Sequence, residues 1–282
     1  MRSIPYQIVV EQVRELCLRA AFDLPADVRN ALEQARAAEA APLGQALLEQ
    51  CLANAATAAD KRLPICQDTG FCVYFVELGV DVRIEGGLLA DAINEGTRQG
   101  YEQGYLRKSI VADPVFDRVN TNDNTPAVIH LEQVPGDRLR LCLAPKGGGS
   151  ENMSAVRMLK PSDGCEGVVE FVVEQTTQAG GNPCPPTIVG VGIGGTFEKV
   201  AYLAKKALLR QPPGAPHPTA AYAELEQEIL TRINASGVGP QGLGGSTTAL
   251  AVHIETFPCH IASLPVAVNL NCHAARHAAA EI

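Results

Sequence analysis

The chain has 282 residues, of which 46% are hydrophobic, and a formal net charge of −8 at pH 7. This length allows a large buried core, and the mean hydropathy near zero is typical of a globular protein. No apolar run approaches the roughly 20 residues that cross a bilayer, and no signal peptide is visible, so we expect a cytoplasmic protein that binds no membrane. The acidic charge and the lack of a basic tract argue against a nucleic-acid partner.

The predicted elements begin with about 60 helical residues, in which apolar side chains recur at helical spacing. A buried strand is then expected at 71–78, a short strand at 80–84 and a helix at 86–105. Turn-forming residues at 120–126 predict a loop. Further strands are expected at 127–131, 139–144, 187–195, 249–254 and 261–268, and further helices at 153–159, 164–178, 196–210 and 220–234.

The order of these elements shows no regular βαβ repeat. It predicts a mixed α/β (α+β) fold, in which mixed sheets are flanked by helices and loops carry the site. We expect one domain over 1–282, with a helical amino-terminal cap over 1–60 and a body that binds cofactor and substrate over 61–282.

The nine cysteines are an odd number and are scattered, which favours thiols or metal ligands over a disulfide framework. Cys66, Cys184 and Cys272 each lie in a polar or Pro/Gly-interrupted turn beside an apolar run. They form no close C-x-x-C pair of the kind that structural zinc sites use. Three isolated thiolates suit a cuboidal iron–sulfur cluster, whose fourth iron stays open to substrate. Core thiols and a structural zinc-binding protein remain the alternatives.

Glycine-rich segments occur at 145–152, 190–195 and 237–248. The second formally matches G-x-G-x-x-G, but a Pro/Gly linker follows where a dinucleotide fold needs a second strand and an acidic residue. The third lacks the Gly-Lys-Ser/Thr of a P-loop, so a nucleotide-binding protein is a weaker alternative. The first, with Lys146, has the features of an anion-binding loop, although ordinary turn geometry also explains its glycines.

Several of these segments together resemble class I fumarate hydratases, the iron–sulfur type. L(+)-tartrate dehydratases and mesaconate-hydrating relatives share the pattern, which covers the chain from Cys66 to Cys272. The matching segments are Cys-Gln-Asp-Thr-Gly at 66–70, the block 107–128, Lys-Gly-Gly-Gly-Ser-Glu-Asn at 146–152, Gly-Ile-Gly-Gly-Thr at 192–196, Gly-Leu-Gly-Gly at 242–245, His260, and Asn-Cys at 271–272.

The resemblance implies a hydro-lyase with a [4Fe-4S] cluster that reversibly hydrates fumarate to (S)-malate. L(+)-tartrate and mesaconate are the alternative substrates within the family. Cys66, Cys184 and Cys272 would ligate three irons, and the fourth iron would act as a Lewis acid on the small dicarboxylate substrate.

The resemblance also implies the substrate site. Gln67, Asp68, Arg107 and a backbone amide near Gly148 would line it, and the Arg107 fork suits a carboxylate. Lys146 would pair with substrate, or alternatively hold a neighbouring glutamate.

Two residues are expected to be catalytic. Asp68 is the best general base in the chain, and its alternative role is to orient loop amides. His260 would reach the site of a symmetry-related copy, and its alternative is a satisfied core histidine. His273 and Arg276 flank Cys272 and are expected to support that ligand from outside the reaction.

The chain ends at Ile282, soon after the third cysteine, where single-chain relatives continue into a further domain. We therefore expect an alpha subunit that needs a separate beta subunit, in a dimer of alpha–beta pairs.

Overall fold

The computed structural model describes all 282 residues, Met1–Ile282. The chain forms two compact units. Unit 1 comprises Met1–Pro25, Ala55–Gly148 and Arg276–Ile282, and unit 2 comprises Ala26–Asn54 and Gly149–Ala275. Both combine helices with mixed sheets, which confirms the predicted fold class. None of the helices has the length and apolar character needed to cross a membrane.

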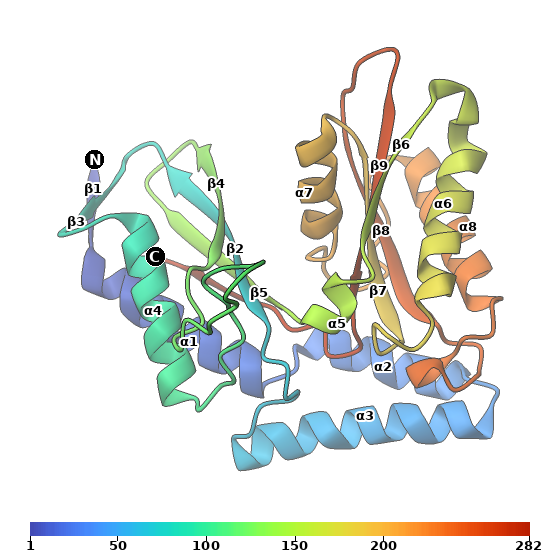
Figure 1. Ribbon diagram of the computed structural model, residues 1–282, viewed down its shortest axis with the longest axis horizontal. Helices are drawn as coiled ribbons and strands as arrows, with labels where there is room; N and C mark the ends of the chain where they lie inside the picture. Colours follow the sequence, from blue (N-terminus) through green and yellow to red (C-terminus); the bar gives the residue numbers. More distant parts are fainter. The chain divides into compact units, whose positions relative to one another are not determined.

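Unit 1 contains a four-stranded sheet with the order β10-β5-β2-β4. Strand β2 pairs in parallel with β4 and antiparallel with β5, and β10 is antiparallel to β5. Helices α1 and α4 pack against each other, and α1 also contacts β5 and β10 (Figure 1). A separate parallel pair joins β1 to β3. The bounds are β1 Arg2–Pro5, α1 Tyr6–Phe22, β2 Phe71–Gly79, β3 Val82–Glu85, α4 Leu89–Gln103, β4 Val128–Val134, β5 Leu139–Lys146 and β10 Ala278–Glu281.

The core of unit 1 lies between the two helices and the sheet, around Tyr74, Tyr101 and Leu141. Helices α1 and α4 pack closely because α4 carries two glycines on the facing side. A Cβ at Gly96 would lie 2.6 Å from the Val10 carbonyl oxygen, and one at Gly100 would lie 2.6 Å from a side-chain carbon of α1. Larger residues at these two positions would force the helices apart.

Unit 2 contains a second four-stranded sheet, with the order β6-β9-β7-β8. Strand β7 is parallel to β8 and antiparallel to β9, and β6 is antiparallel to β9. Helix α7 covers one face, whereas α6 and α8 cover the other (Figure 1). The bounds are α2 Ala26–Ala38, α5 Gly148–Glu151, β6 Ala155–Leu159, α6 Gly164–Ala179, β7 Thr187–Gly194, α7 Phe197–Ala207, α8 Ala220–Asn234, β8 Ala249–Phe257 and β9 Leu264–Asn271. Helix α3, Pro42–Lys61, and helix α5 each have residues in both units.

The glycines of the G-x-G-x-x-G match serve the packing of unit 2. Built Cβ atoms at Gly190 and Gly192 would lie 2.1 and 2.2 Å from backbone oxygens of α7. Only glycine allows this helix to lie so close to β7. The segment is therefore a strand, a turn and a closely packed helix, as the failed dinucleotide match predicts.

One predicted element is wrong. Residues 153–159 were expected to be helical, but Ala155–Leu159 forms β6 and pairs antiparallel with β9. Its Met, Leu and Arg residues are good helix formers, but helix propensity is a small energy that pairing with a neighbouring strand outweighs. Three helices occupy the predicted helical stretch from about residue 5 to 60, of which α1 belongs to unit 1 and α2 to unit 2, whereas Arg2–Pro5 before them forms strand β1. The single domain over 1–282 stays a prediction.

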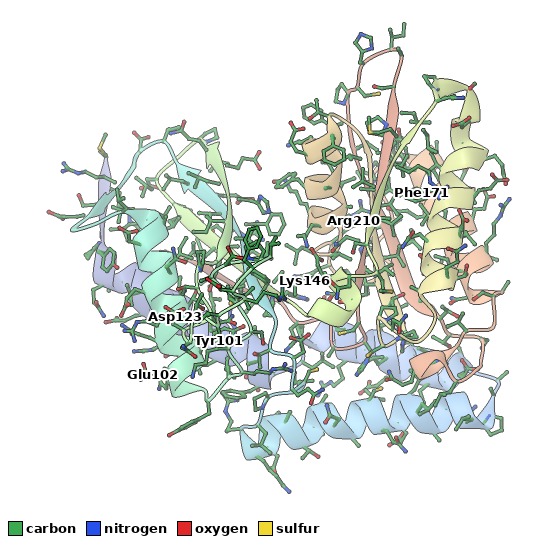
Figure 2. The ribbon with its side chains drawn as sticks, in the orientation of Figure 1. Tyr101, Glu102, Asp123, Lys146, Phe171 and Arg210 are labelled. Carbon is green, nitrogen blue, oxygen red and sulfur yellow. The ribbon has the colours of Figure 1, made fainter.

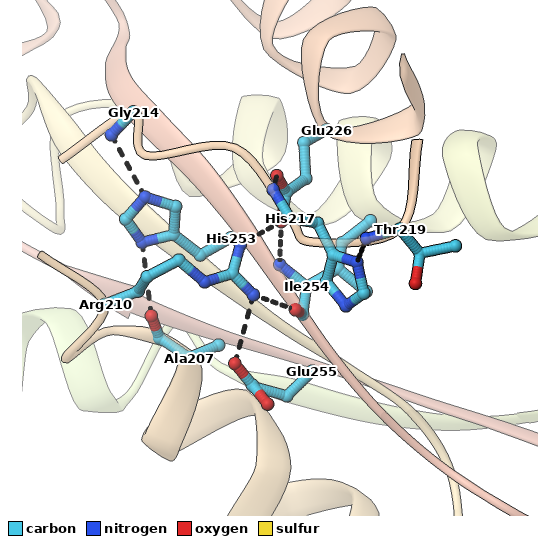
Figure 3. Close-up of polar contacts among 9 residues, drawn as sticks. All are labelled: Ala207, Arg210, Gly214, His217, Thr219, Glu226, His253, Ile254 and Glu255. Carbon is cyan, nitrogen blue, oxygen red and sulfur yellow. Dashed lines mark hydrogen bonds and ion pairs between the residues drawn. The ribbon is translucent and has the colours of Figure 1, made fainter. Parts of the chain in front are cut away.

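A buried charged network holds the segment after α7 against β8 in unit 2 (Figure 3). The Arg210 guanidinium pairs with Glu226 and, at 3.0 Å, with Glu255. His253 is fully buried, and its ring bonds to the Gly214 amide at 3.0 Å and the Ala207 carbonyl at 3.2 Å. Burial and the nearby Arg210 charge lower the pKa of His253 to about 4, so the ring is neutral at physiological pH.

Candidate functional site

The Cys66–Gly70 turn leads from α3 into β2 in unit 1. Gln67 is exposed, whereas Cys66 and Asp68 are partly buried. Gly70 has φ +81°, and a Cβ there would lie 2.7 Å from the backbone of Lys146. Glycine is therefore required at this position, both for its backbone conformation and for the close approach of β5.

Asp68 joins this turn to the first glycine loop. Its Oδ2 accepts the Gly148 N–H at 2.7 Å, and its Oδ1 accepts the Gly70 N–H at 3.1 Å. The arrangement matches the orienting role weighed for Asp68. It leaves each carboxylate oxygen one lone pair for a further donor. The Gly148 amide, expected to face substrate, is bonded to Asp68 here.

Buried side chains hold the backbone of the turn from below. The Tyr101 hydroxyl lies 2.9 Å from the Thr69 carbonyl oxygen and 3.0 Å from that of Gly70. The Asn124 amide donates to the Gly70 carbonyl at 3.1 Å. Burial raises the pKa of Tyr101 well above its usual value, so the phenol stays a donor. The sequence predicted neither support, because each reaches the turn from a distant segment.

The predicted substrate residues Arg107 and Lys146 lie on neighbouring segments of unit 1. Thr69 Oγ1 donates to the Arg107 carbonyl at 2.7 Å, which ties the exposed Arg107 to the turn. Lys146 is the last residue of β5, where it pairs in register with Phe71, and its side chain is buried. Figure 2 shows Lys146 together with Tyr101 of α4. Unit 1 thus gathers Gln67, Asp68, Arg107, Lys146 and Gly148 around the start of β2.

Cys184 and Cys272 lie in unit 2. Cys184 is exposed, in the turn before β7, with φ +54°, and Cys272 directly follows β9. The His273 backbone N–H donates to the Cys184 carbonyl at 3.2 Å, and His273 Nδ1 lies 3.0 Å from the same oxygen. The two segments meet because β7 and β9 are antiparallel neighbours, with Ile188 opposite Asn271.

Gln241 supports both of these segments. Its Nε2 donates to the Pro185 carbonyl at 2.8 Å and lies 3.1 Å from His273 Nδ1. Its backbone N–H also donates to Pro185, at 2.7 Å, and its φ is +55°. Cys51 lies beside the same amide, 3.9 Å away. Burial raises the pKa of Cys51 to about 11, with further contributions from Cys272 and Cys184, so this thiol stays protonated.

Glu39 holds the third glycine loop and was missed in the sequence. Its carboxylate accepts the Ser246 amide at 2.9 Å and the Ala41 amide at 3.0 Å. Burial alone would raise its pKa, but these amides and the hydroxyls of Ser246 and Thr247 lower the pKa of Glu39 to about 2. A glutamate inside a helical, Ala-rich stretch carried no signal of this role.

His260 lies in unit 2, on the loop between β8 and β9, and is exposed. The alternative of a satisfied core histidine is therefore wrong. Its Nδ1 accepts the Ala262 N–H at 3.1 Å, and it lines a cavity of about 370 Å³ together with Phe197 and Phe257. Its catalytic role stays a prediction.

The donor set suits a thiolate-bound cofactor. All nine cysteines are thiols without disulfides, and Cys66, Cys184 and Cys272 lie in turns and are open to solvent at least in part. Cys17, Cys51 and Cys72 are buried, as expected of packing residues. The three candidates are divided between the units, and no three His, Cys, Asp or Glu side chains are gathered at metal-binding distance.

The chain is similar to proteins that are named as subunits. It is 42% identical over 275 residues to a protein of Methanocaldococcus jannaschii named as a candidate L(+)-tartrate dehydratase subunit alpha, which covers 96% of this chain and 95% of that protein. It is 37% identical over 260 residues to L(+)-tartrate dehydratase subunit alpha of Escherichia coli strain UTI89, and 36% identical to that of strain K12, each covering 90% of this chain and 84% of the relative. The profile of the Fumerase family, described as fumarate hydratase, matches residues 10–281, and the chain therefore belongs to this family.

Proposed function

We propose that the chain is the alpha subunit of an iron–sulfur hydro-lyase that removes water from a four-carbon hydroxydicarboxylate. The observation that carries the proposal is the cluster of Asp68, Arg107, Lys146 and the Gly148 amide beside Cys66, at the start of β2. A carboxylate with free lone pairs, two cations and a glycine loop are the groups that a dicarboxylate and a proton abstraction require.

L(+)-tartrate is the proposed substrate. The relatives named above are L(+)-tartrate dehydratase alpha subunits, so the comparisons favour this alternative over fumarate, which we expected first. Tartrate carries one hydroxyl more than malate. A site built to bond that hydroxyl rejects the analogue without it far more strongly than a pocket rejects one methyl group. Fumarate and mesaconate are the second candidates.

In the proposed mechanism Cys66, Cys184 and Cys272 hold a [4Fe-4S] cluster. When bound, the cluster supplies a Lewis acid that makes hydroxide a better leaving group. Asp68 accepts the proton from the carbon next to a substrate carboxylate, and the electron pair left on that carbon forms the double bond as hydroxide leaves its neighbour. The Gly148 and Gly70 amides orient the Asp68 carboxylate for this transfer.

The cations stabilise the negative charge that builds on the substrate during proton removal. Arg107 is exposed at the edge of the site and is able to bind a carboxylate at two points. Lys146 lies buried at the end of β5, where a positive charge acts more strongly than in water. We propose that the rest of the site belongs to a beta subunit, since the relatives are named as alpha subunits.

Anaerobic co-expression with the companion subunit tests this function. We expect a brown protein with iron and sulfide that dehydrates L(+)-tartrate faster than (S)-malate in a substrate panel. A colourless protein that holds stoichiometric zinc would contradict the proposal and support the structural zinc alternative.

A matched pair of cysteine variants sharpens the test within unit 2. Cys184→Ser should lose most of the bound iron and the activity, because a hydroxyl is a poor replacement for a thiolate ligand. Cys165→Ser changes a similarly exposed thiol on α6 and should keep both. Equal iron contents in the two variants would remove Cys184 from the ligand set.

A further inference from the structure

Arg276 is a buried cation with too few acceptors. Its side chain is only 2% exposed, in unit 1, two residues before β10. Nη2 donates to the Asp68 carbonyl oxygen at 2.8 Å. Nε and Nη1 are buried and have no hydrogen-bond partner. A buried charge in this state is costly, because neither water nor a protein anion compensates it.

Arg276 is paired with no carboxylate, and its one hydrogen bond goes to a backbone carbonyl. Its charge acts on the Cys72 thiol and the Tyr101 phenol, which are both buried. Burial would raise the pKa of the Cys72 thiol, but hydrogen bonds with Cys17, Tyr101 and Tyr74 and the nearby Arg276 charge lower it below its usual value. The thiol lies 3.5 Å from the Tyr101 hydroxyl. Tyr101 is held neutral by burial. The one acceptor that Arg276 has is a carbonyl dipole, with no formal charge.

The position of Arg276 in the chain indicates where an anion would lie. It follows Cys272 by four residues, and the carbonyl it bonds belongs to Asp68, two residues after Cys66. Within unit 1, its guanidinium thus bonds directly to the turn that carries Cys66.

We propose that Arg276 is the positioning residue of the Cys66 turn and the charge partner of the anionic, thiolate-ligated cluster that Cys66 would hold. This inference rests on the proposed function. Three thiolates and the sulfide core carry a net negative charge, and a buried cation acts on it through a medium of low dielectric. Because protein atoms cover Nε and Nη1, the Arg276 charge would act on the cluster through space and would form no direct hydrogen bond with it.

The test compares three substitutions in the full chain, loaded with cluster under anaerobic conditions. Arg276→Lys keeps the charge, Arg276→Gln keeps a donor without the charge, and Arg276→Met removes both. Arg140→Gln is the control, since Arg140 is an exposed arginine of unit 1 that pairs with Glu77 at 3.5 Å. The readouts are the reduction potential of the cluster, the rate of iron loss to a chelator, and the thermal unfolding of the cluster-free chain.

We expect the reduction potential to fall in the Gln and Met variants and to stay near wild type in the Lys variant and the control. Removing a positive charge makes the cluster harder to reduce. Iron loss from Arg276→Met should be about tenfold faster, as for other partners of metal ligands. The cluster-free Met variant should unfold at the same temperature as wild type or above it, because it no longer buries an uncompensated charge.

Two outcomes would overturn this inference and leave the proposed function intact. A cluster-free Met variant that unfolds at lower temperature, with an unchanged potential when loaded, would make Arg276 a structural pin of the turn. A change confined to the KM for tartrate would make it a substrate residue. A wild-type chain that takes up no iron would overturn the proposed function, and this inference with it.

Discussion

The two units have the same strand pattern but different polar chemistry at the same corner of the sheet. In each sheet the strand directions run antiparallel, antiparallel and parallel across the four strands, with β2 and β7 in equivalent places. Each of these strands is preceded by a turn with a candidate cysteine. Each starts opposite the end of its antiparallel neighbour, as Phe71 faces Lys146 and Ile188 faces Asn271.

A carboxylate and a guanidinium hold the corner of unit 1, whereas an amide and an imidazole hold that of unit 2. In unit 1 the Asp68 carboxylate accepts two amides and the buried Arg276 bonds its carbonyl. In unit 2 the Gln241 amide and the His273 ring hold the turn of Cys184. The same backbone arrangement therefore presents a cysteine in both units, and in unit 1 a carboxylate and a buried guanidinium bond to the turn that carries it.

The largest expected effect tests the corner of unit 1. Asp68→Asn keeps the size of the side chain and removes the proton acceptor, so kcat/KM for tartrate should fall by about 10²–10⁴. Iron content should stay at the wild-type level. Asp137→Asn, at an exposed position of unit 1, is the control. A loss of less than tenfold would leave Asp68 with its orienting role alone.

The second-largest expected effect tests the network of Arg210 and His253 in unit 2, which lies outside the corner that carries Cys184. The folded pKa of His253 is about 4, below the ordinary 6.5, so its contribution to stability is complete above pH 6.5. As the pH falls from 6.5 towards 4, the unfolded chain takes up a proton that the folded chain does not. About 3 kcal/mol of stability should be lost in this window.

Unfolding in denaturant at pH 7 and pH 4.5 measures this loss. A His253→Gln variant has no such proton to bind, so its stability deficit relative to wild type should shrink as the pH falls. A deficit that stays constant between the two pH values would contradict the assignment. The stability that the Glu39 carboxylate contributes is lost at lower pH, between about 4.5 and 2. This range lies mostly below the pH range in which His253 acts.

The smallest expected effect tests the corner of unit 2, where Gln241 and His273 hold the turn of Cys184. Gln241→Met removes the bonds to Pro185 and His273 while keeping a similar volume. We expect about tenfold faster iron loss to a chelator, with an unchanged rate per bound cluster. Gln178→Met, on the exposed side of α6, is the control. A variant that holds iron normally but turns over slowly would place Gln241 in the reaction itself and would contradict its role as a support of the Cys184 turn.

Much of the fold followed from local patterns. Helix α8 occupies the predicted 220–234, and β2 covers the predicted apolar run. These elements are readable because period and composition agree along the segment. The prediction for 153–159 failed because its residues favour helix locally, whereas pairing with β9, more than a hundred positions away, decides its structure. Strand β10 was missed because it has only four residues and its partner β5 is also distant in the sequence.

The sequence alone identified the candidate chemistry of this protein, namely its three turn cysteines, the Asp68 turn and the glycine loops, and the family match is consistent with it. Only the tertiary structure decided which groups support them. Glu39 reaches Ser246, and Arg276 reaches Asp68, across more than 200 positions. Such contacts leave no local signal, because a hydrogen bond depends on where two segments lie in space and leaves the periodicity of either one unchanged.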